Sequence, residues 1–171
     1  GHTSSDLIGY RDRDDFVQSY PFVRYQFVLM PSILNELRKH GYSGKHISTG
    51  ERSMLSSFQE SAQAIENEGL GALVPLWRVF DTLENQMDHG VRQVFERCRC
   101  ACEDGQGLQP GDTEVLKTLY MVVYVGSYIE ATPNNVAILM ADKIDQDVAA
   151  LRSQVSASLD RLVAQGYVSR E

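Results

Sequence analysis

The C-terminal stretch DVAALRSQVSASLDRLVAQGYVSRE (residues 147–171) decides the fold that we expect for this chain. Apolar side chains recur in it at the three- and four-residue spacing of a buried helix face, at Val148, Leu151, Val155, Leu159 and Leu162. Gly166 follows where a helix end favours left-handed backbone, and Tyr167 and Val168 then begin a strand. The stretch therefore predicts a long helix that leads through a glycine into a strand.

Two more helices are predicted directly before it. The segment TEVLKTLYMVVYVGSY (residues 113–128) has apolar residues at helical spacing, and ATPNNVAILMADKI (residues 131–144) opens with a cap at Thr132 and a proline at the first helical position, Pro133. A helix, a short capped helix, a longer helix and then a strand is the order of a winged helix-turn-helix. Residues 111–171 therefore predict a winged-helix domain.

A winged helix that reads DNA places its third helix in the major groove. The outward face of the predicted third helix holds Ser153 and Gln154, flanked by Arg152 and Arg161, and these four are the candidate DNA contacts. Three aspartates crowd the start of the same helix, where their carboxylates would repel DNA phosphates; they are Asp142, Asp145 and Asp147. Two interpretations stay open: a DNA reader, or a winged helix that packs against protein.

The run EDGQGLQPGD (residues 103–112) is the best candidate for a domain boundary, because it is turn-forming throughout. Residues 16–110 before it predict a helical domain. Residues 1–15 predict a tag scar, from the opening Gly-His-Thr, followed by a loosely held lead-in. We thus expect a mainly α protein, in which a helical bundle precedes the winged helix.

Within residues 16–110, prolines and glycines predict where the helices break. Pro21 should interrupt the first apolar segment, and Pro31 should start a short helix. Gly90 is either a weak point inside a long helix or a break between two helices. The aromatic side chains around Pro21 either form a packing seam or offer a stacking surface for bases.

The stretch HGYSGKHISTGERSML (residues 40–55) is close to a phosphate-binding loop but does not fit one. Such a loop needs the pattern G-x-x-x-x-G-K-[ST], in which backbone amides hold the phosphates and the hydroxyl holds magnesium. If Gly44 and Lys45 are the G-K pair, Lys39 stands at the first glycine position and His46 at the hydroxyl position. We therefore expect that this chain alone does not hydrolyse ATP.

The same stretch does predict the start of a helix. Ser48 and Glu51 have the spacing of a capping box. Arg52 then falls in the first turn, where a cation faces the positive end of the helix dipole. Its guanidinium either points from the helix start toward a phosphate or is a surface group paired with Glu51 or another nearby acid.

Composition excludes several classes of protein. The chain has 171 residues, of which 43% are apolar and 23% charged, as in ordinary soluble globular proteins. No apolar run approaches the roughly 20 residues of a membrane span, so we expect no membrane partner. The net charge of −7 argues against wholesale binding of nucleic acid or anionic membranes, although a local basic face is compatible with it.

The three cysteines, Cys98, Cys100 and Cys102, favour a reduced, cytoplasmic protein, because their number is odd and no secretory signal is present. Zinc sites usually pair cysteines as C-x2-4-C with a second pair elsewhere, whereas here the spacing is C-x-C-x-C and there is no second cluster. On a helix Cys98 and Cys102 share a face as small buried hydrophobes, while Cys100 points away. No nucleophile lies near a base in sequence, so we expect no catalytic residue, metal or cofactor within the chain.

Three stretches resemble one family. YPFVRYQF (residues 20–27), GKHISTGERSMLSSFQ (residues 44–59) and VSASLDRLVAQGYVSR (residues 155–170) are similar to the P-loop ATPases of BREX phage-defence systems, the BrxC/PglY type. The resemblance runs over most of the chain from about residue 16. It implies a large cytoplasmic AAA+-like ATPase whose core, which binds ATP and magnesium, lies upstream of Gly1. Residues 16–110 would then be the helical lid, followed by the winged helix.

The resemblance also gives Arg52 a specific role. Lid helices of initiator-type AAA+ ATPases begin with a small or acidic stretch, an arginine that senses the terminal phosphate, and two apolar residues. Arg52 followed by Met54 and Leu55 is similar to that arrangement. Gly50 and Glu51 lie one residue nearer to the arginine than in the usual pattern, so this part of the motif departs from the family.

We therefore expect a non-catalytic C-terminal segment of a phage-defence ATPase that couples nucleotide state to the engagement of a partner or of DNA. The implied partners are the upstream ATPase core, other defence-system proteins and DNA, with homo-oligomers formed through the parent protein. The alternative is a DNA-binding winged-helix regulator with a helical partner domain. The reading frame upstream separates the two, because a Walker A sequence favours the first and a start codon near Asp6 the second.

Overall fold

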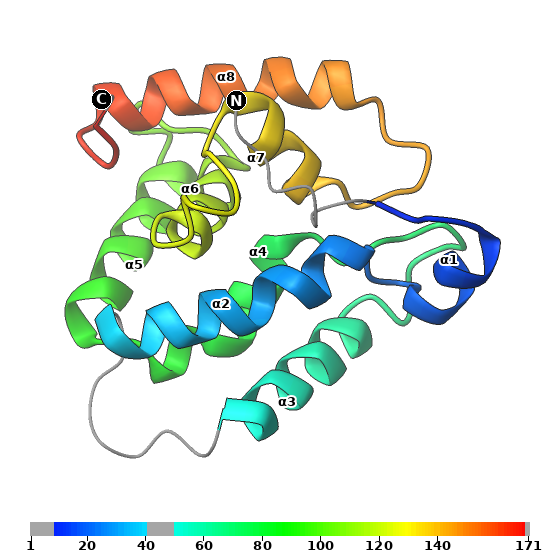
Figure 1. Ribbon diagram of the computed structural model, residues 1–171. Helices are drawn as coiled ribbons and strands as arrows, with labels where there is room; N and C mark the ends of the chain where they lie inside the picture. Colours follow the sequence, from blue (N-terminus) through cyan, green and yellow to red (C-terminus); the bar gives the residue numbers. More distant parts are fainter. Residues whose placement is uncertain (1–8, 41–49, 170–171) are drawn as a thin grey trace.

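The computed structural model describes residues 9–40 and 50–169, with the side chains of residues 50–52 excepted. Within these residues it contains eight α-helices and one short 3-10 helix, and no strand (Figure 1). The prediction of a mainly α protein is confirmed. The winged helix is not confirmed, because Tyr167 and Val168, where we expected a strand to begin, are not in one.

Helices α1 (Arg13–Ser19) and α2 (Arg24–His40) flank Pro21, which breaks the segment as predicted. The prediction that Pro31 starts a helix is wrong, because Pro31 lies inside α2. The apolar side chains before and after the proline form one continuous buried stripe: Tyr25, Leu29, Met30, Ile33, Leu34 and Leu37. Burial of this stripe outweighs the single backbone hydrogen bond that a proline removes.

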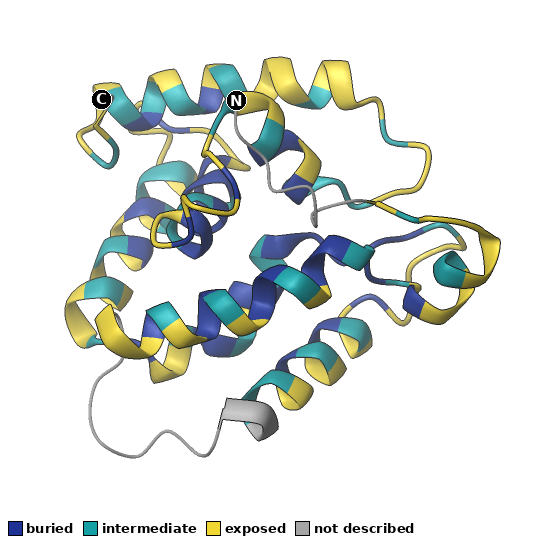
Figure 2. Cartoon of the chain, in the orientation of Figure 1, coloured by how far each residue is buried: buried dark blue, intermediate teal, exposed yellow. Residues whose placement is uncertain are grey.

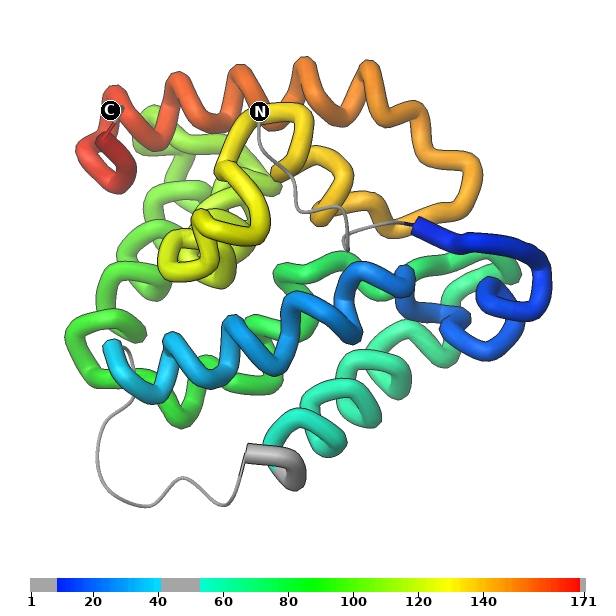
Figure 3. The backbone as a smooth tube through the Cα atoms, viewed as in Figure 1, coloured from blue at the N-terminus to red at the C-terminus, as the bar shows by residue number. Residues whose placement is uncertain are grey.

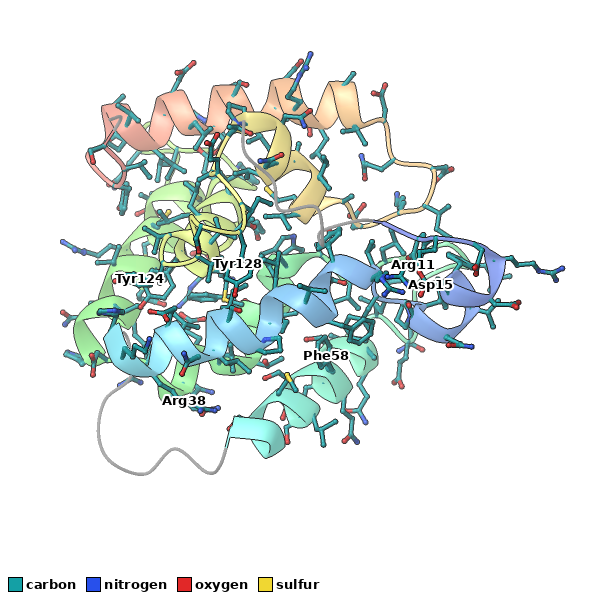
Figure 4. All side chains as sticks on the ribbon, viewed as in Figure 1. Arg11, Asp15, Arg38, Phe58, Tyr124 and Tyr128 are labelled. Atoms are coloured by element: carbon teal, nitrogen blue, oxygen red, sulfur yellow. The ribbon has the colours of Figure 1, made fainter. Side chains whose placement is uncertain are left out.

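Residues 9–15, which we expected to be loosely held, make several contacts. The Tyr10 hydroxyl donates to the carbonyl of Phe22 at 3.1 Å, and Asp12 caps α1 by accepting from the Asp15 amide at 2.9 Å. The Asp15 carboxylate accepts from the Arg11 amide and pairs with Arg24, and these contacts lower its pKa (Figure 4). This end of the chain is thereby attached to the start of α2.

Three α-helices and a 3-10 turn complete the first part of the chain: α3 (Gly50–Gln63), α4 (Leu76–Leu83), η1 (Glu84–Gln86) and α5 (His89–Glu103). Phe58 of α3 points toward α2, where its ring lies 5.1 Å from that of Phe27 (Figure 4). For Gly90 the sequence left two options, and the structure is closer to the second, a break between two helices. The interruption falls just before it, at the buried Met87 and at Asp88.

The last part contains α6 (Asp112–Val122), α7 (Pro133–Met140) and α8 (Val148–Ala164). The predicted cap of α7 is confirmed, since Thr132 Oγ1 accepts from the Asn135 amide at 3.2 Å and Pro133 follows it. Gly166 ends α8 with a φ of 76°. The amides of Gly166 and Tyr167 return to the last turn of α8, in the pattern of a Schellman motif.

Helix α6 lies at the centre of the molecule, where it contacts α2, α4, α5, α7 and α8. Helix α8 runs along one side and α3 along the opposite side, with α2, α4 and α6 between them (Figure 3). The domain division after residue 110 stays a prediction. Buried side chains from both sides of that residue form one cluster (Figure 2), which includes Leu29, Phe80, Phe95, Leu116, Met121, Leu139 and Leu162.

Replacing Pro31 with alanine should stabilise the protein. The alanine amide can donate within α2 where the proline cannot, and the side chain is exposed, so we expect a gain of about 1–3 kcal/mol in the free energy of unfolding. Urea unfolding measures it, with Ser32→Ala as the matched control. A lower urea midpoint for Pro31→Ala than for the control would show that the packing of α2 needs the proline.

Candidate functional site

The outward face of α8 carries most of the residues that we predicted to contact DNA. Asp147 caps this helix, since its Oδ1 accepts from the Ala150 amide at 2.9 Å. Arg152, Ser153 and Gln154 follow in the next turn, and all three are exposed. The Ser153 hydroxyl donates to the carbonyl of Ala149 at 3.2 Å, within the helix. The structure thus brings three of the four predicted DNA contacts together on one surface.

The fourth predicted contact, Arg161, faces the interior. It lies nine positions after Arg152, which is two and a half helical turns, so the two side chains leave opposite sides of α8. The Arg161 guanidinium binds both carboxylate oxygens of Asp112, with Nη2 to Oδ1 at 2.6 Å and Nε to Oδ2 at 2.8 Å. We predicted a surface position for Arg161 because the sequence does not indicate that Asp112 of α6 is its partner.

Asp112 is almost fully buried at the first turn of α6. Burial alone would raise the pKa of its carboxyl. Hydrogen bonds from Arg161 and from the Gln109 amide outweigh burial and lower the pKa below its ordinary value of 3.8. The carboxylate therefore stays charged and holds α6 to α8 at neutral pH.

A second ion pair fastens α6 to α4. Lys117 Nζ lies 2.7 Å from Asp81 Oδ1, and the lysine side chain is 8% exposed. The same ammonium lies 5.8 Å from the centre of the Phe80 ring, so the charge is held against an aromatic face as well. Helix α6 is thus tied by charge to a helix on either side of the predicted domain boundary.

The cysteines lie as predicted with respect to the surface. Cys98 is buried, Cys102 is half-buried and Cys100 is exposed. The sulfur atoms of Cys98 and Cys102 lie 3.5 and 3.4 Å from Thr113 Oγ1 on α6, and burial raises the pKa of Cys98 to about 11. Within residues 9–40 and 50–169, no group of three or more histidine, cysteine or acidic side chains is placed to hold a metal ion.

The predicted phosphate sensor cannot be placed in the same way. Arg52 belongs to the first turn of α3, but its side chain lies outside the described part of the chain, as does the capping-box residue Ser48. What the structure does place is the rest of α3, which packs on α2 and α4. The role of Arg52 therefore stays a prediction.

The link between α7 and α8 carries the three predicted aspartates and makes an unexpected contact. The Leu73 amide donates to the carbonyl of Asp142 at 2.8 Å, and the Ile144 amide donates to the carbonyl of Gly71 at 2.9 Å. These bonds surround an antiparallel bridge between Ala72 and Lys143. Two loops from different parts of the sequence are joined here, which no local sequence pattern indicates.

An apolar groove of about 1020 Å³ opens between α5, α6 and α8. Its walls are mainly aliphatic and include Val94, Leu119, Leu159 and Val163, while Tyr120 lies among them. Burial, with Tyr124 and Asp88 nearby, raises the pKa of Tyr120 to about 12, so its hydroxyl is a neutral donor at physiological pH. The groove can take apolar groups, and the sequence analysis did not predict it.

Replacing Asp112 with asparagine should destabilise the fold strongly. It leaves Arg161 without its anionic partner, and because the arginine is 26% exposed we expect a loss of about 2–4 kcal/mol at neutral pH. Urea unfolding checks this, with exposed Asp104→Asn as the control. Because the folded-state pKa of Asp112 is lowered, its contribution is complete above 3.8 and is lost as the pH falls through the folded-state value.

The difference in stability between wild type and Asp112→Asn should therefore shrink as the pH falls below 3.8. A difference that stays constant through that range, or a loss no larger than for Asp104→Asn, would show that the ion pair contributes little.

No helix in the described part of the chain is long and apolar enough to cross a membrane. No protein-family model matches the sequence, and no solved structure matches the chain.

Proposed function

We propose that this chain is a non-catalytic coupling module, the C-terminal segment of an AAA+-like ATPase of bacterial phage defence. In this role it passes the nucleotide state of an upstream core to a surface that engages a partner protein. The resemblance of three stretches to the BREX ATPases of the BrxC/PglY type supports the identity of the parent. The packing of α6 supports the coupling.

The ion pairs of α6 are the observation that carries the proposal. Asp112 binds Arg161 of α8, and Lys117 binds Asp81 of α4, so one central helix is fixed to both sides of residue 110. Both α6 partners in these pairs are buried. Moving either neighbour away would leave a buried charge unpaired, which is costly, so the three helices are expected to move as one unit.

The proposed route begins at Arg52 and crosses the molecule. Helix α3 contacts α4, α4 contacts α6, and α6 contacts α8. Figure 3 shows α3 and α8 on opposite sides, and the central helix α6 is one of the connections through which a shift at the start of α3 can reach α8.

ATP and magnesium belong to the upstream core in this proposal. The one group that this chain contributes at the nucleotide is the Arg52 guanidinium. A cation aimed at the terminal phosphate stabilises the negative charge of the transition state for phosphoryl transfer. The bridge between Ala72 and Lys143 adds a second connection between the lid-like part and the last three helices.

A DNA-binding winged helix is the second candidate. The order α6, α7 and α8 followed by Gly166 favours it, as do the three exposed side chains on α8. The three aspartates of the α7–α8 link oppose it, because they lie where the DNA backbone would approach the start of α8. Arg161 is also engaged by Asp112. We therefore favour a protein partner over DNA.

In the intact parent ATPase, Arg52→Ala should lower ATP turnover at least tenfold, roughly the effect of removing a transition-state cation. Thermal unfolding of the same variant should change little. Arg38→Ala, an exposed arginine of α2, is the control and should keep wild-type turnover. Wild-type turnover in Arg52→Ala, or an upstream reading frame without a Walker A sequence, would contradict the proposal.

Fluorescence anisotropy of this chain with a short labelled DNA duplex should show no binding, even at low salt, because carboxylates surround the start of α8. Micromolar binding that weakens with salt and is lost in Arg152→Ala, but not in Arg92→Ala on α5, would instead make α8 a DNA reader.

A further inference from the structure

A tight turn at Gly69–Ala72 presents one leucine to solvent. The Ala72 amide donates to the carbonyl of Gly69 at 3.1 Å, and Gly71 has a φ of 94°. That left-handed backbone at the third position is the signature of a type II turn, and it favours glycine. Leu70 occupies the second position, and its side chain is fully exposed. The turn therefore fixes the backbone of an apolar side chain that packs on nothing within the molecule.

Two other exposed apolar side chains meet this turn at Gly71. The Gly71 amide donates to the Tyr20 hydroxyl at 3.3 Å, so the tyrosine lies against the turn. The Gly71 carbonyl accepts from the Ile144 amide, and the tip of the isoleucine side chain is the neighbour that a Cβ at Gly71 would contact. Tyr20 is 37% and Ile144 52% exposed. Three segments distant in sequence thus contribute to one apolar surface.

Single exposed apolar residues are common on protein surfaces, whereas a cluster of them whose position is fixed by backbone hydrogen bonds is typical of an interaction site. We name Tyr20, Leu70 and Ile144 the Gly71 patch. Its position is fixed by the same contacts that join the lid-like part to the α7–α8 link.

Acidic residues dominate two of the three segments that form the patch, the loops that carry Leu70 and Ile144. Residues 64–72 and 141–147 contain five carboxylates and one basic side chain, that of Lys143: the acids are Glu66, Glu68, Asp142, Asp145 and Asp147. Glu68 pairs with Arg78, and Asp147 caps α8. The other three carboxylates make no side-chain hydrogen bond or ion pair within the described residues. The apolar surface is therefore edged by negative charge available to a partner.

We propose that the Gly71 patch docks a basic, amphipathic segment of a partner protein, with apolar side chains on Leu70 and Ile144 and lysine or arginine near the carboxylates. This inference deepens the proposed coupling function by naming the partner-facing surface and its chemistry. DNA and anionic membranes carry the wrong charge for it. A second copy of this chain is also a poor occupant, because a symmetric dimer would bring the same carboxylates face to face.

The test uses this chain and three labelled peptides of equal length with helical spacing: a lysine/leucine peptide, a lysine/serine peptide and a glutamate/leucine peptide. Anisotropy should report binding of the first and little of the other two. Leu70→Ser combined with Ile144→Ser should weaken that binding about tenfold or more, since each side chain loses its burial in the complex. Leu55→Ser, which alters a 67% exposed leucine of α3, is the matched control and should bind as wild type does.

A charge variant tests the second half of the proposal. Asp142→Lys combined with Asp145→Lys should transfer the preference from the lysine/leucine to the glutamate/leucine peptide. Circular dichroism confirms that each variant is folded, which is expected because the altered side chains are not part of the core.

Amide NMR shifts identify the surface directly. The lysine/leucine peptide should shift the signals of Gly71 and Ile144, and not those of Val94 and Leu119 in the apolar groove. Shifts confined to the groove, equal binding by the Leu70/Ile144 variant, or an equal loss in Leu55→Ser would each overturn the proposal. ATP turnover of Arg52→Ala does not involve the patch, so either proposal can fail while the other stands.

Discussion

The buried ion pair between Asp112 and Arg161 is the contact on which the last third of the molecule depends. A carboxylate with almost no exposure is stable only when its hydrogen-bonding capacity is met. Here two guanidinium nitrogens and a backbone amide meet it, in a geometry that fixes both distance and angle. The pair sets how α8 crosses the start of α6, and therefore which face of α8 is turned outward.

That orientation decides how the outward face of α8 can act. Arg152, Ser153 and Gln154 are exposed, while the half-buried Arg161 is paired with Asp112 and aspartates precede the helix. The surface is therefore less basic than its sequence suggests. The same α7–α8 link that carries the aspartates is bonded to the turn at Gly71, so negative charge collects beside exposed apolar side chains. Charge and exposure together favour a basic protein segment over nucleic acid.

Local signals predicted much of the fold. Pro21 between two helices, the Thr132-Pro133 start of α7 and the Gly166 end of α8 depend on backbone rules that act over a few residues. The prediction that Pro31 starts a helix was wrong because burial of the long apolar stripe of α2 outweighs the local preference of proline for the first turn of a helix. The ion pairs join residues 49 and 36 positions apart, and the loop bridge is also long-range, so no periodicity could reveal them. For the site, sequence spacing could have separated Arg161 from Arg152, whereas the Gly71 patch required the tertiary structure.

We infer that α6 joins residues 16–110 and the last three helices into one mechanical unit. Urea unfolding can be followed at equilibrium by the fluorescence of Trp77, the single tryptophan, which lies in α4, and by amide hydrogen exchange in α8. We expect the same urea midpoint from both probes. The slowest-exchanging amides of α4 and α8 should also have equal free energies of opening. Two separate midpoints, with α8 opening while the environment of Trp77 stays native, would contradict it.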